Sequence, residues 1–295
     1  MLAWYAANGR GLAFRTTSDP YAVLVSELMA QQTQAERAAE AWTAWMARWP
    51  AVEALAAAPV ADVLRAWAGL GYNRRAVALH RAAKAIVADH GGRVPDDVGA
   101  LEALPGVGPY TARAVAAIGF GRPVGAVDTN VRRVLGRIAV GGPGALTSAA
   151  MQALADAVVP AGRAAAWTHA VMDLGAGPCA SRNPRCGACP AAPWCRFAAG
   201  ERALEPVAPR ASARRAQGDA SSGQALAFPA TSRWLRGRVL ARARDAVDGS
   251  WVAYGEPIGA HPPEAVREAV LTLERDGLLE VREGAGGLEA RLPDG

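Results

Sequence analysis

Four cysteines lie close together in the pattern Cys179-x6-Cys186-x2-Cys189-x5-Cys195, and the chain contains no others. Secreted proteins held by disulfides usually spread their cysteines along the sequence, and residues 1–11 hold no apolar run of signal-peptide length. The crowding therefore favours a bound metal over disulfide bonds. Four thiolates suit either a zinc ion or an iron–sulfur cluster, and the spacing alone leaves both open.

A second chemical signal is a pair of carboxyl groups in contrasting surroundings. Glu27 interrupts the apolar, helix-like run 25–30. Burial there would raise the pKa of Glu27 and suit it to act as a general acid, although a lone glutamate more often lies on a solvated face. Asp128 precedes a predicted helix, near backbone amides and solvent, and should stay ionised. A neutral and an ionised carboxyl group together are what glycoside hydrolysis uses.

A glycine turn joins two helical stretches at Leu104-Pro105-Gly106-Val107-Gly108-Pro109. Gly106 and Gly108 allow unusual backbone conformations and leave no side chain to block a close approach. Their amides, with the positive end of the following helix, predict a site for DNA phosphate oxygens. Such a turn taken alone is more often ordinary packing between helices, so the prediction depends on the neighbouring motifs.

The elements that position these residues are predicted to be almost entirely helical from Pro20 to Leu174. Apolar residues recur at three- and four-residue intervals, and Pro or Gly breaks divide the region into roughly ten short helices. No alternating strand pattern occurs there. The expected fold class is therefore mainly α, with the cysteine loop following the helical array.

The character of the sequence changes after Cys195. Residues 205–231 are rich in Pro, Ala, Ser, Gly and Arg and predict a linker. A compact tail follows, with helices predicted at 233–247 and 263–275 and strands at 278–282 and 288–292 around a Gly-rich turn. We therefore expect three parts: 1–200, the linker 205–231, and a small winged-helix-like α+β module at 232–295. A structural or partner-binding cap is as good an interpretation of this module as DNA contact.

Composition sets wider bounds. The chain has 295 residues, 51% of them hydrophobic, enough for a full core and more than one domain. The net charge of +5 and the pI of about 9.4 favour a polyanionic partner, though only weakly. Lys84 is the only lysine. No apolar stretch approaches the length that a membrane-spanning helix needs. We expect a monomeric, cytoplasmic bacterial protein associated with the nucleoid.

Together these motifs resemble the helix-hairpin-helix (HhH-GPD) superfamily of DNA glycosylases. The hairpin 104–108, the run 127–134 after it, the helix 26–34 and the cysteine pattern are most similar to the MutY-type adenine DNA glycosylases. The first 200 residues follow that family almost without gaps, which implies the family's fold of two helical subdomains. About the last 90 residues do not follow it. The resemblance implies that Glu27 protonates adenine N7 and that Asp128 stabilises the cationic sugar or traps it covalently. It also implies that the four cysteines hold a [4Fe–4S] cluster, on a loop that presents Arg182, Arg185 and Arg196 to phosphate.

The resemblance assigns further roles in binding mismatched or damaged double-stranded DNA. Gln32 would wedge into the DNA double helix, Thr33 would contact the flanking bases, and Tyr72 would stack beside the opposite base. The alternative for Tyr72 is a tyrosine of the protein core. Tyr110 stands where bifunctional relatives carry a lysine, so the enzyme should be monofunctional, without strand-cleaving lyase activity. The resemblance also implies that Tyr110 is a catalytic-site residue that supports Glu27 and Asp128. The remaining DNA-contact candidates are Gly106, Gly108 and Asn130, and those for the base pocket are Arg10, Phe14, Arg15, Ala30 and Asp173.

Three differences from the family leave open which base is excised and whether the protein is an enzyme. Phe14 replaces the family's tryptophan, Ala30 replaces a leucine beside the base pocket, and the tail lacks the NUDIX-like domain that recognises 8-oxoguanine. The sequence predicts excision of adenine opposite 8-oxoguanine or guanine. The alternatives are excision of another base, such as thymine or uracil opposite guanine or an alkylated purine, and a non-catalytic, redox-sensing DNA-binding protein.

Overall fold

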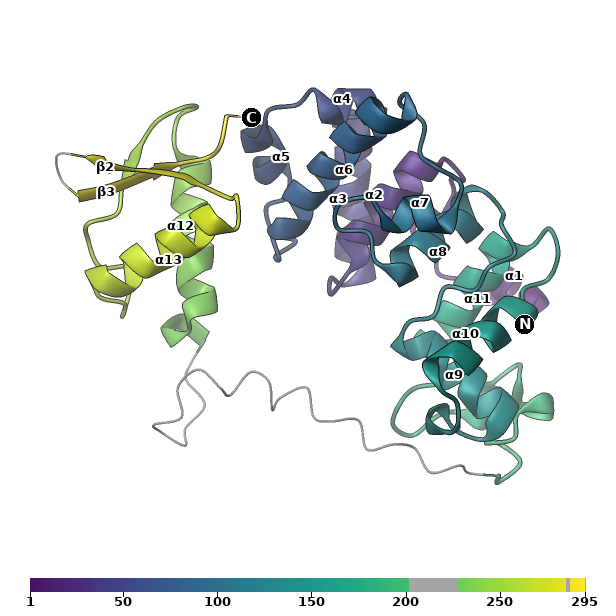
Figure 1. Ribbon diagram of the computed structural model, residues 1–295. Helices are drawn as coiled ribbons and strands as arrows, with labels where there is room; N and C mark the ends of the chain where they lie inside the picture. The colour runs from purple at the N-terminus through teal and green to yellow at the C-terminus, as the bar shows by residue number, and fades with distance from the viewer. Residues whose placement is uncertain (202–227, 285–286, 295) are drawn as a thin grey trace. The chain divides into compact units, whose positions relative to one another are not determined.

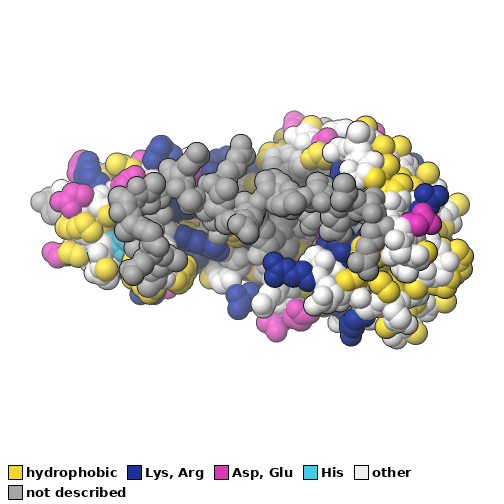
Figure 2. Space-filling view, turned by 90° about the horizontal axis from the view of Figure 1, so that it is seen from below, with side chains coloured by type: hydrophobic (Ala, Val, Ile, Leu, Met, Phe, Trp, Pro, Cys, Tyr) yellow, Lys and Arg dark blue, Asp and Glu magenta, His cyan; other side chains and the backbone are white. Residues whose placement is uncertain are grey.

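The computed structural model describes residues 1–201, 228–284 and 287–294 and is mainly helical, with short strands near the C-terminus (Figure 1). The described residues fall into two compact units. The first contains residues 1–31 and 94–201, and the second contains residues 32–93 and 228–294. Basic side chains are visible across the face shown in Figure 2, as expected from the net charge of +5.

The first unit is built from helices, several of them begun by side-chain caps. Asp19 accepts from the Tyr21 amide, Asp97 from the Ala100 amide and Asp128 from the Val131 amide. The elements are α1 (Leu2–Asn8), η1 (Ala13–Arg15), α2 (Pro20–Ala30), α7 (Val98–Glu102), α8 (Pro109–Gly119), α9 (Thr129–Val140), η2 (Pro143–Ala145), α10 (Ser148–Ala157), α11 (Ala164–Ala176), η3 (Cys186–Ala188) and η4 (Ala192–Trp194).

Helices α2 and α8 pack against each other unusually closely. A Cβ added to Gly119, the last residue of α8, would lie 3.0 Å from Pro20 Cα at the start of α2. Glycine therefore permits the close approach. At the other end, Gln31 Nε2 donates to Thr111 Oγ1 at 3.2 Å. These two contacts fix helix α2 against helix α8 along its length.

The second unit combines four helices of the first half of the chain with the C-terminal module. Trp45 and Trp67 are both fully buried in its core and meet edge to face, with ring centres 5.6 Å apart. The elements are α3 (Ala35–Arg48), α4 (Val52–Ala56), α5 (Val60–Ala66), α6 (Arg74–His90), η5 (Phe228–Ala230), α12 (Ser232–Asp245), β1 (Val252–Ala253), α13 (Pro263–Arg275), β2 (Glu280–Gly284) and β3 (Gly287–Arg291).

The C-terminal module packs α12 and α13 beside a three-stranded antiparallel sheet of order β1-β3-β2 (Figure 1). Val281 pairs with Ala290 across β2 and β3. Tyr254 is buried and donates from its hydroxyl to the Val239 carbonyl at 2.8 Å. Backbone and ion-pair contacts join the module to α5 and α6, including Ala61 N to Pro293 O at 3.1 Å. The module is thus part of the second unit.

The predicted number of helices between Pro20 and Leu174 is confirmed. In the C-terminal module, the predicted helices and strands are confirmed as elements, although some of their bounds differ. Helices α2 to α11 make ten, and the predicted helix 263–275 has the observed bounds. The other C-terminal helix ends two residues early, and the strands lie at 280–284 and 287–291. Strand β1, only two residues long, had no alternating pattern to reveal it. Most of the predicted linker, 205–231, lies outside the described residues, although 228–230 form η5 and Thr231 caps α12.

No helix among the described residues has the length and apolar character needed to cross a membrane.

Candidate active site

Glu27 is the only residue between Tyr21 and Met29 on helix α2 that is not buried. Its carboxyl group nevertheless lies deep enough that burial raises its pKa from the ordinary 4.5 to about 7. A hydrogen bond with Tyr110 and the charge of Arg15 oppose the rise, while the nearby charge of Asp128 adds to it. A carboxyl group in these surroundings, on a residue that is not fully buried, can hold a proton near neutral pH and deliver it.

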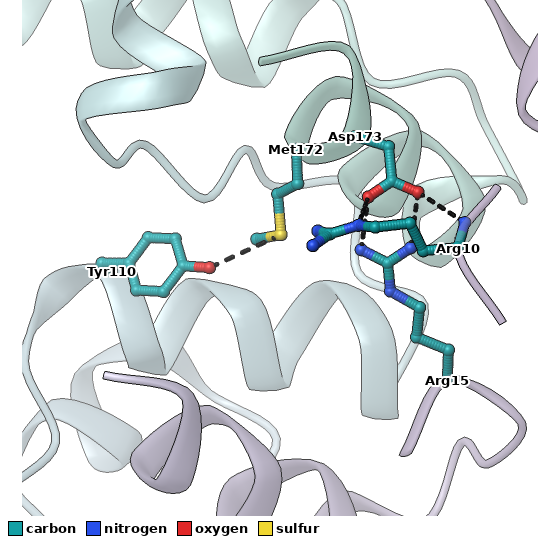
Figure 3. Close-up of polar contacts among 5 residues, drawn as sticks. All are labelled: Arg10, Arg15, Tyr110, Met172 and Asp173. Atoms are coloured by element: carbon teal, nitrogen blue, oxygen red, sulfur yellow. Dashed lines mark hydrogen bonds and ion pairs between the residues drawn. The ribbon is translucent and has the colours of Figure 1, made fainter. Parts of the chain in front are cut away.

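Tyr110, the second residue of α8, is the hydrogen-bond partner of Glu27. Burial, followed by the negative charges of Glu27 and Asp128, raises the pKa of its phenol well above the usual value. The phenol therefore stays neutral and acts as a hydrogen-bond partner of the Glu27 carboxyl group. Its oxygen also lies 3.7 Å from Met172 Sδ on α11 (Figure 3). The tyrosine links helices α2, α8 and α11 at one point.

Asp128 is held at the N-terminus of α9. One carboxylate oxygen, Oδ1, accepts from the Val131 amide at 2.6 Å, and the other, Oδ2, accepts from Asn130 Nδ2 at 3.0 Å. Arg133 Nη2 in turn donates to Asn130 Oδ1 at 2.8 Å, so Asn130 is itself oriented. The structure thus gives Asn130 a role in positioning Asp128. A half-buried carboxylate fixed in this way suits a developing positive charge.

An ion-pair network lies near Glu27 and Tyr110. Asp173 on α11 is buried and accepts from Arg10 Nε at 2.7 Å, and from Arg15 Nη1 and Nη2 at 2.7 and 2.9 Å (Figure 3). Burial alone would raise the pKa of Asp173, but the hydrogen bonds from Arg15 and Arg10 hold it below its usual value. Three of the predicted pocket residues are therefore brought together. Phe14 is buried in η1, and Ala30 ends α2 half-buried.

The predicted hairpin connects α7 to α8. Gly106 has φ +79°, a conformation that favours glycine, which agrees with the sequence argument. Gly108 differs, because its φ of −97° is open to any residue. A Cβ added there would meet nothing within 4 Å, so glycine leaves the start of α8 exposed for a close approach. The turn therefore places a glycine with positive φ and an exposed glycine directly before the N-terminus of α8.

Gln32, Thr33 and Tyr72 belong to the second unit. Two of them are strained, since Gln32 and Tyr72 have φ of +54° and +44° although neither is glycine. Arg75 Nη2 donates to Thr33 Oγ1 at 3.2 Å and to the Leu70 carbonyl at 3.0 Å, which joins the loop of Thr33 to that of Tyr72. Such strain persists where the surrounding structure enforces it and is common at functional sites.

The four cysteines all line one small pocket, and no disulfide joins them. Arg137 of α9 also lines this pocket, although no sequence pattern singled out this residue. Its side chain is buried, with Nη1 3.7 Å from Cys179 Sγ and 2.7 Å from the Ala180 carbonyl, and its guanidinium stacks on Phe197. Within the described residues no group of His, Cys, Asp or Glu has the arrangement of a metal-ion site. The predicted phosphate contacts Arg182, Arg185 and Arg196 are exposed.

Comparison with known proteins shows the family. A model described as "HhH-GPD superfamily base excision DNA repair protein" matches residues 25–160. The adenine DNA glycosylase of Mycobacterium tuberculosis is 43% identical over 244 residues, 81% of this chain and 76% of that protein. The protein of the same name from Mycolicibacterium smegmatis is 38% identical over 282 residues, 95% of this chain and 91% of that protein. The latter match must therefore extend into the C-terminal module, so the last 90 residues depart from the family less than expected.

Solved structures agree on the fold. A thermostable thymine-DNA glycosylase matches with a TM-score of 0.63 and 30% identity, over 68% of this chain and 93% of that one. A trapped covalent intermediate of endonuclease III with DNA matches with a TM-score of 0.57 over 68% and 92%, and its 22% identity shows the fold alone. The chain therefore belongs to the HhH-GPD superfamily of base excision DNA repair proteins and, within it, to the adenine DNA glycosylases.

Proposed function

We propose that this chain excises adenine mispaired with 8-oxoguanine or guanine in double-stranded DNA, and that it leaves the DNA backbone intact. The observation that carries the proposal is Glu27, a residue that is not fully buried and whose carboxyl group has its pKa raised to about 7 by burial. Near neutral pH about half of such groups carry the proton that a leaving adenine requires. The adenine-specific relatives support the choice of base.

The reaction then follows from the groups in place. Glu27 donates its proton to adenine N7, and the C1′–N9 bond breaks with its electron pair passing to the base. The Asp128 side chain, fixed by the Val131 amide and Asn130, stabilises the positive charge that develops on the sugar. Water adds to C1′, and its proton returns to the Glu27 carboxylate. Tyr110 orients that carboxyl group throughout.

Gln32, Thr33 and Tyr72 are proposed to hold the DNA while the adenine is out of the stack. The strained backbone at Gln32 and Tyr72 supports this role, since such strain needs a reason. Gly106 and Gly108 of the hairpin are proposed to bind phosphate through backbone amides. Asn130, which holds Asp128 from within the protein, would contact DNA only at the edge of this site.

A panel of duplex oligonucleotides tests the proposal. The panel contains A opposite 8-oxoguanine, A opposite G, T opposite G and U opposite G, and base release is detected by alkali cleavage. The thymine-DNA glycosylase among the structural matches makes the T opposite G duplex the necessary competitor. Release of adenine supports the proposal, release of thymine assigns the chain to another base, and tight binding with no release leaves only a DNA-binding protein.

We further propose that the four cysteines hold a [4Fe–4S] cluster. They line one pocket, and a buried arginine, Arg137, places its positive charge against them. Four thiolates around an iron–sulfur cluster carry net negative charge, so a buried cation is a fitting neighbour. When bound, the cluster would supply structural support to the loop that presents Arg182, Arg185 and Arg196.

Purified protein should therefore contain about four irons per chain and absorb broadly near ~400 nm, as iron–sulfur thiolate proteins do. Metal and sulfide analysis of anaerobically prepared protein measures this, with Cys186→Ser as the cluster-deficient control. Stoichiometric zinc without iron or sulfide would contradict the cluster.

Tyr110→Lys should give the enzyme some strand-nicking activity, because it places an amine where the neutral phenol now lies. An amine can form an imine with the sugar aldehyde, whereas a phenol cannot. Borohydride should trap a covalent protein–DNA adduct with this variant, and none with wild type or with the control Tyr110→Phe. Efficient trapping by wild type would show that the enzyme is not monofunctional and direct attention to Lys84 or the N-terminal amine.

A further inference from the structure

The loop before α6 exposes Tyr72 in a conformation that a bulky residue rarely adopts. Its φ is +44°, and the residue is 40% exposed. Arg75 anchors the loop by donating from Nη2 to the carbonyl oxygens of Leu70 and Gly71 at 3.0 and 3.1 Å. The Arg75 guanidinium also lies 5.7 Å from the centre of the Tyr72 ring. The protein therefore holds an aromatic ring at its surface by constraints on both backbone and side chain.

One face of α12, in the C-terminal module, lies beside this loop. Positions 233, 237 and 244 share that face because they are four and seven residues apart. The Arg233 guanidinium is 5.1 Å from the centre of the Tyr72 ring, and Arg244 Nη2 donates to Asn73 Oδ1 at 2.7 Å. Between the two arginines lies Gly237, where an added Cβ would meet nothing within 4 Å.

Two residues on this face weaken the helix that carries them. Arg233 is the second residue of α12, whose first turn has no acidic residue, so its charge opposes the helix dipole. Gly237 stands mid-helix, where glycine is among the least favourable residues. Within the part of the chain that the structure describes, Arg233 has no hydrogen bond or ion pair, and no neighbouring atom needs the space at Gly237. Apart from the Tyr72 ring beside Arg233, nothing in the described structure accounts for these two locally unfavourable residues, and such choices are typical of binding sites.

We propose that this face of α12, through Arg233 and Gly237 beside Tyr72, binds the phosphate backbone of the DNA strand opposite the excised base. An arginine with its donors available can pair with phosphate oxygens, and a glycine lets a sugar–phosphate chain approach the helix closely. The inference rests on the proposed function and on the sequence-based expectation that Tyr72 stacks beside the opposite base. Because phosphate is the same in every nucleotide, this contact adds affinity without selecting the opposite base.

Gly237 provides a test in which stability and binding should change in opposite directions. Gly237→Ala and Gly237→Gln both favour the helix, and neither side chain meets an obstacle at its Cβ, so Tm should rise by a few degrees. DNA affinity should fall, and more for the larger Gln, because the side chain occupies the space of the backbone. Raised Tm with unchanged or improved affinity would overturn the proposal.

Arg233→Gln tests the charge, with Arg242→Gln as the matched control. Arg242 is also exposed but lies on the opposite side of α12 from Arg233, about half a turn away. All variants carry Glu27→Gln so that the substrate survives, and anisotropy measures binding to labelled duplexes with A opposite 8-oxoguanine or G. Arg233→Gln should weaken both complexes roughly tenfold and lower the log–log salt slope by about one. Arg242→Gln should have little effect.

Two results would contradict the phosphate contact. Equal losses from Arg233→Gln and Arg242→Gln would mean that only total charge matters. A loss confined to the 8-oxoguanine duplex would mean that the module reads the base. Since these measurements record binding alone, they remain informative if the chain releases no adenine, in which case the proposed function fails on the excision assay while the DNA contact is judged separately.

Discussion

Glu27→Gln should release adenine roughly 10²–10⁴-fold more slowly than wild type, the usual contribution of a general acid. Glutamine keeps the size of the side chain and its hydrogen bond with Tyr110, so DNA affinity should be preserved. Single-turnover excision from a duplex with A opposite 8-oxoguanine measures the rate. A residual rate within a factor of about three of wild type would remove Glu27 from the mechanism, since general acids contribute far more.

The raised pKa of Glu27 leads to two further expected results, one for the wild-type enzyme and one for the Glu27→Gln variant. The wild-type excision rate should decline as pH rises above about 7, because the protonated carboxyl group is lost. Between pH 4.5 and 7 the folded protein binds more protons at Glu27 than the unfolded chain, so the free energy of unfolding falls as pH rises through that range. Glutamine does not titrate. At pH 8 the variant should therefore be the more stable protein, by on the order of 1–3 kcal/mol.

A lower Tm for Glu27→Gln than for wild type at pH 8 would contradict the burial of the carboxylate. At pH 4.5 the two proteins should be nearly equal in stability, which provides the internal control. Loss of activity together with a gain of stability also separates a chemical role from damage to the fold.

The sequence predicted the environment of Glu27 because that environment is local. An apolar run on both sides places the residue on a buried helix, and the pKa of about 7 follows from burial. Its contact with Tyr110 is different, because it depends on helices α2 and α8 approaching at Gly119 and Pro20. Residues distant in sequence meet there through packing, which a local pattern does not encode. Only the resemblance to a family suggested that these groups act together.

Three arginines show more clearly which features could not be predicted from the sequence. Arg137 and Arg75 occupy helical positions where an arginine is normally solvated, so composition gave no reason to select either. Arg137 is buried because backbone carbonyls and the Cys179 thiol surround it. Arg75 is half-buried, and three acceptors of two loops meet at its guanidinium. Arg233 is one of several basic residues of α12. Its place beside Tyr72 became visible only from the contact between two distant segments.

Arg15→Met should destabilise the protein by about 3–5 kcal/mol, because it leaves the Asp173 carboxylate buried without its main partner. The side chains of Arg15 and Asp173 are only 6% and 3% exposed. Arg10→Met is the matched control, since Arg10 pairs with the same carboxylate but its side chain is 38% exposed. An exposed pair contributes about 0–1 kcal/mol, so this variant should lose much less. Urea denaturation of both variants gives the comparison.

The same substitution should also change the chemistry in a predictable direction. The positive charge of Arg15 lowers the pKa of Glu27, so its removal should raise that pKa further. The alkaline limb of the excision rate against pH should then move upward in Arg15→Met and stay nearly in place in Arg10→Met. Equal losses of stability in the two variants would show that Asp173 does not depend on Arg15. A downward shift of the pH profile would show that Arg15 does not act on the carboxyl group that delivers the proton.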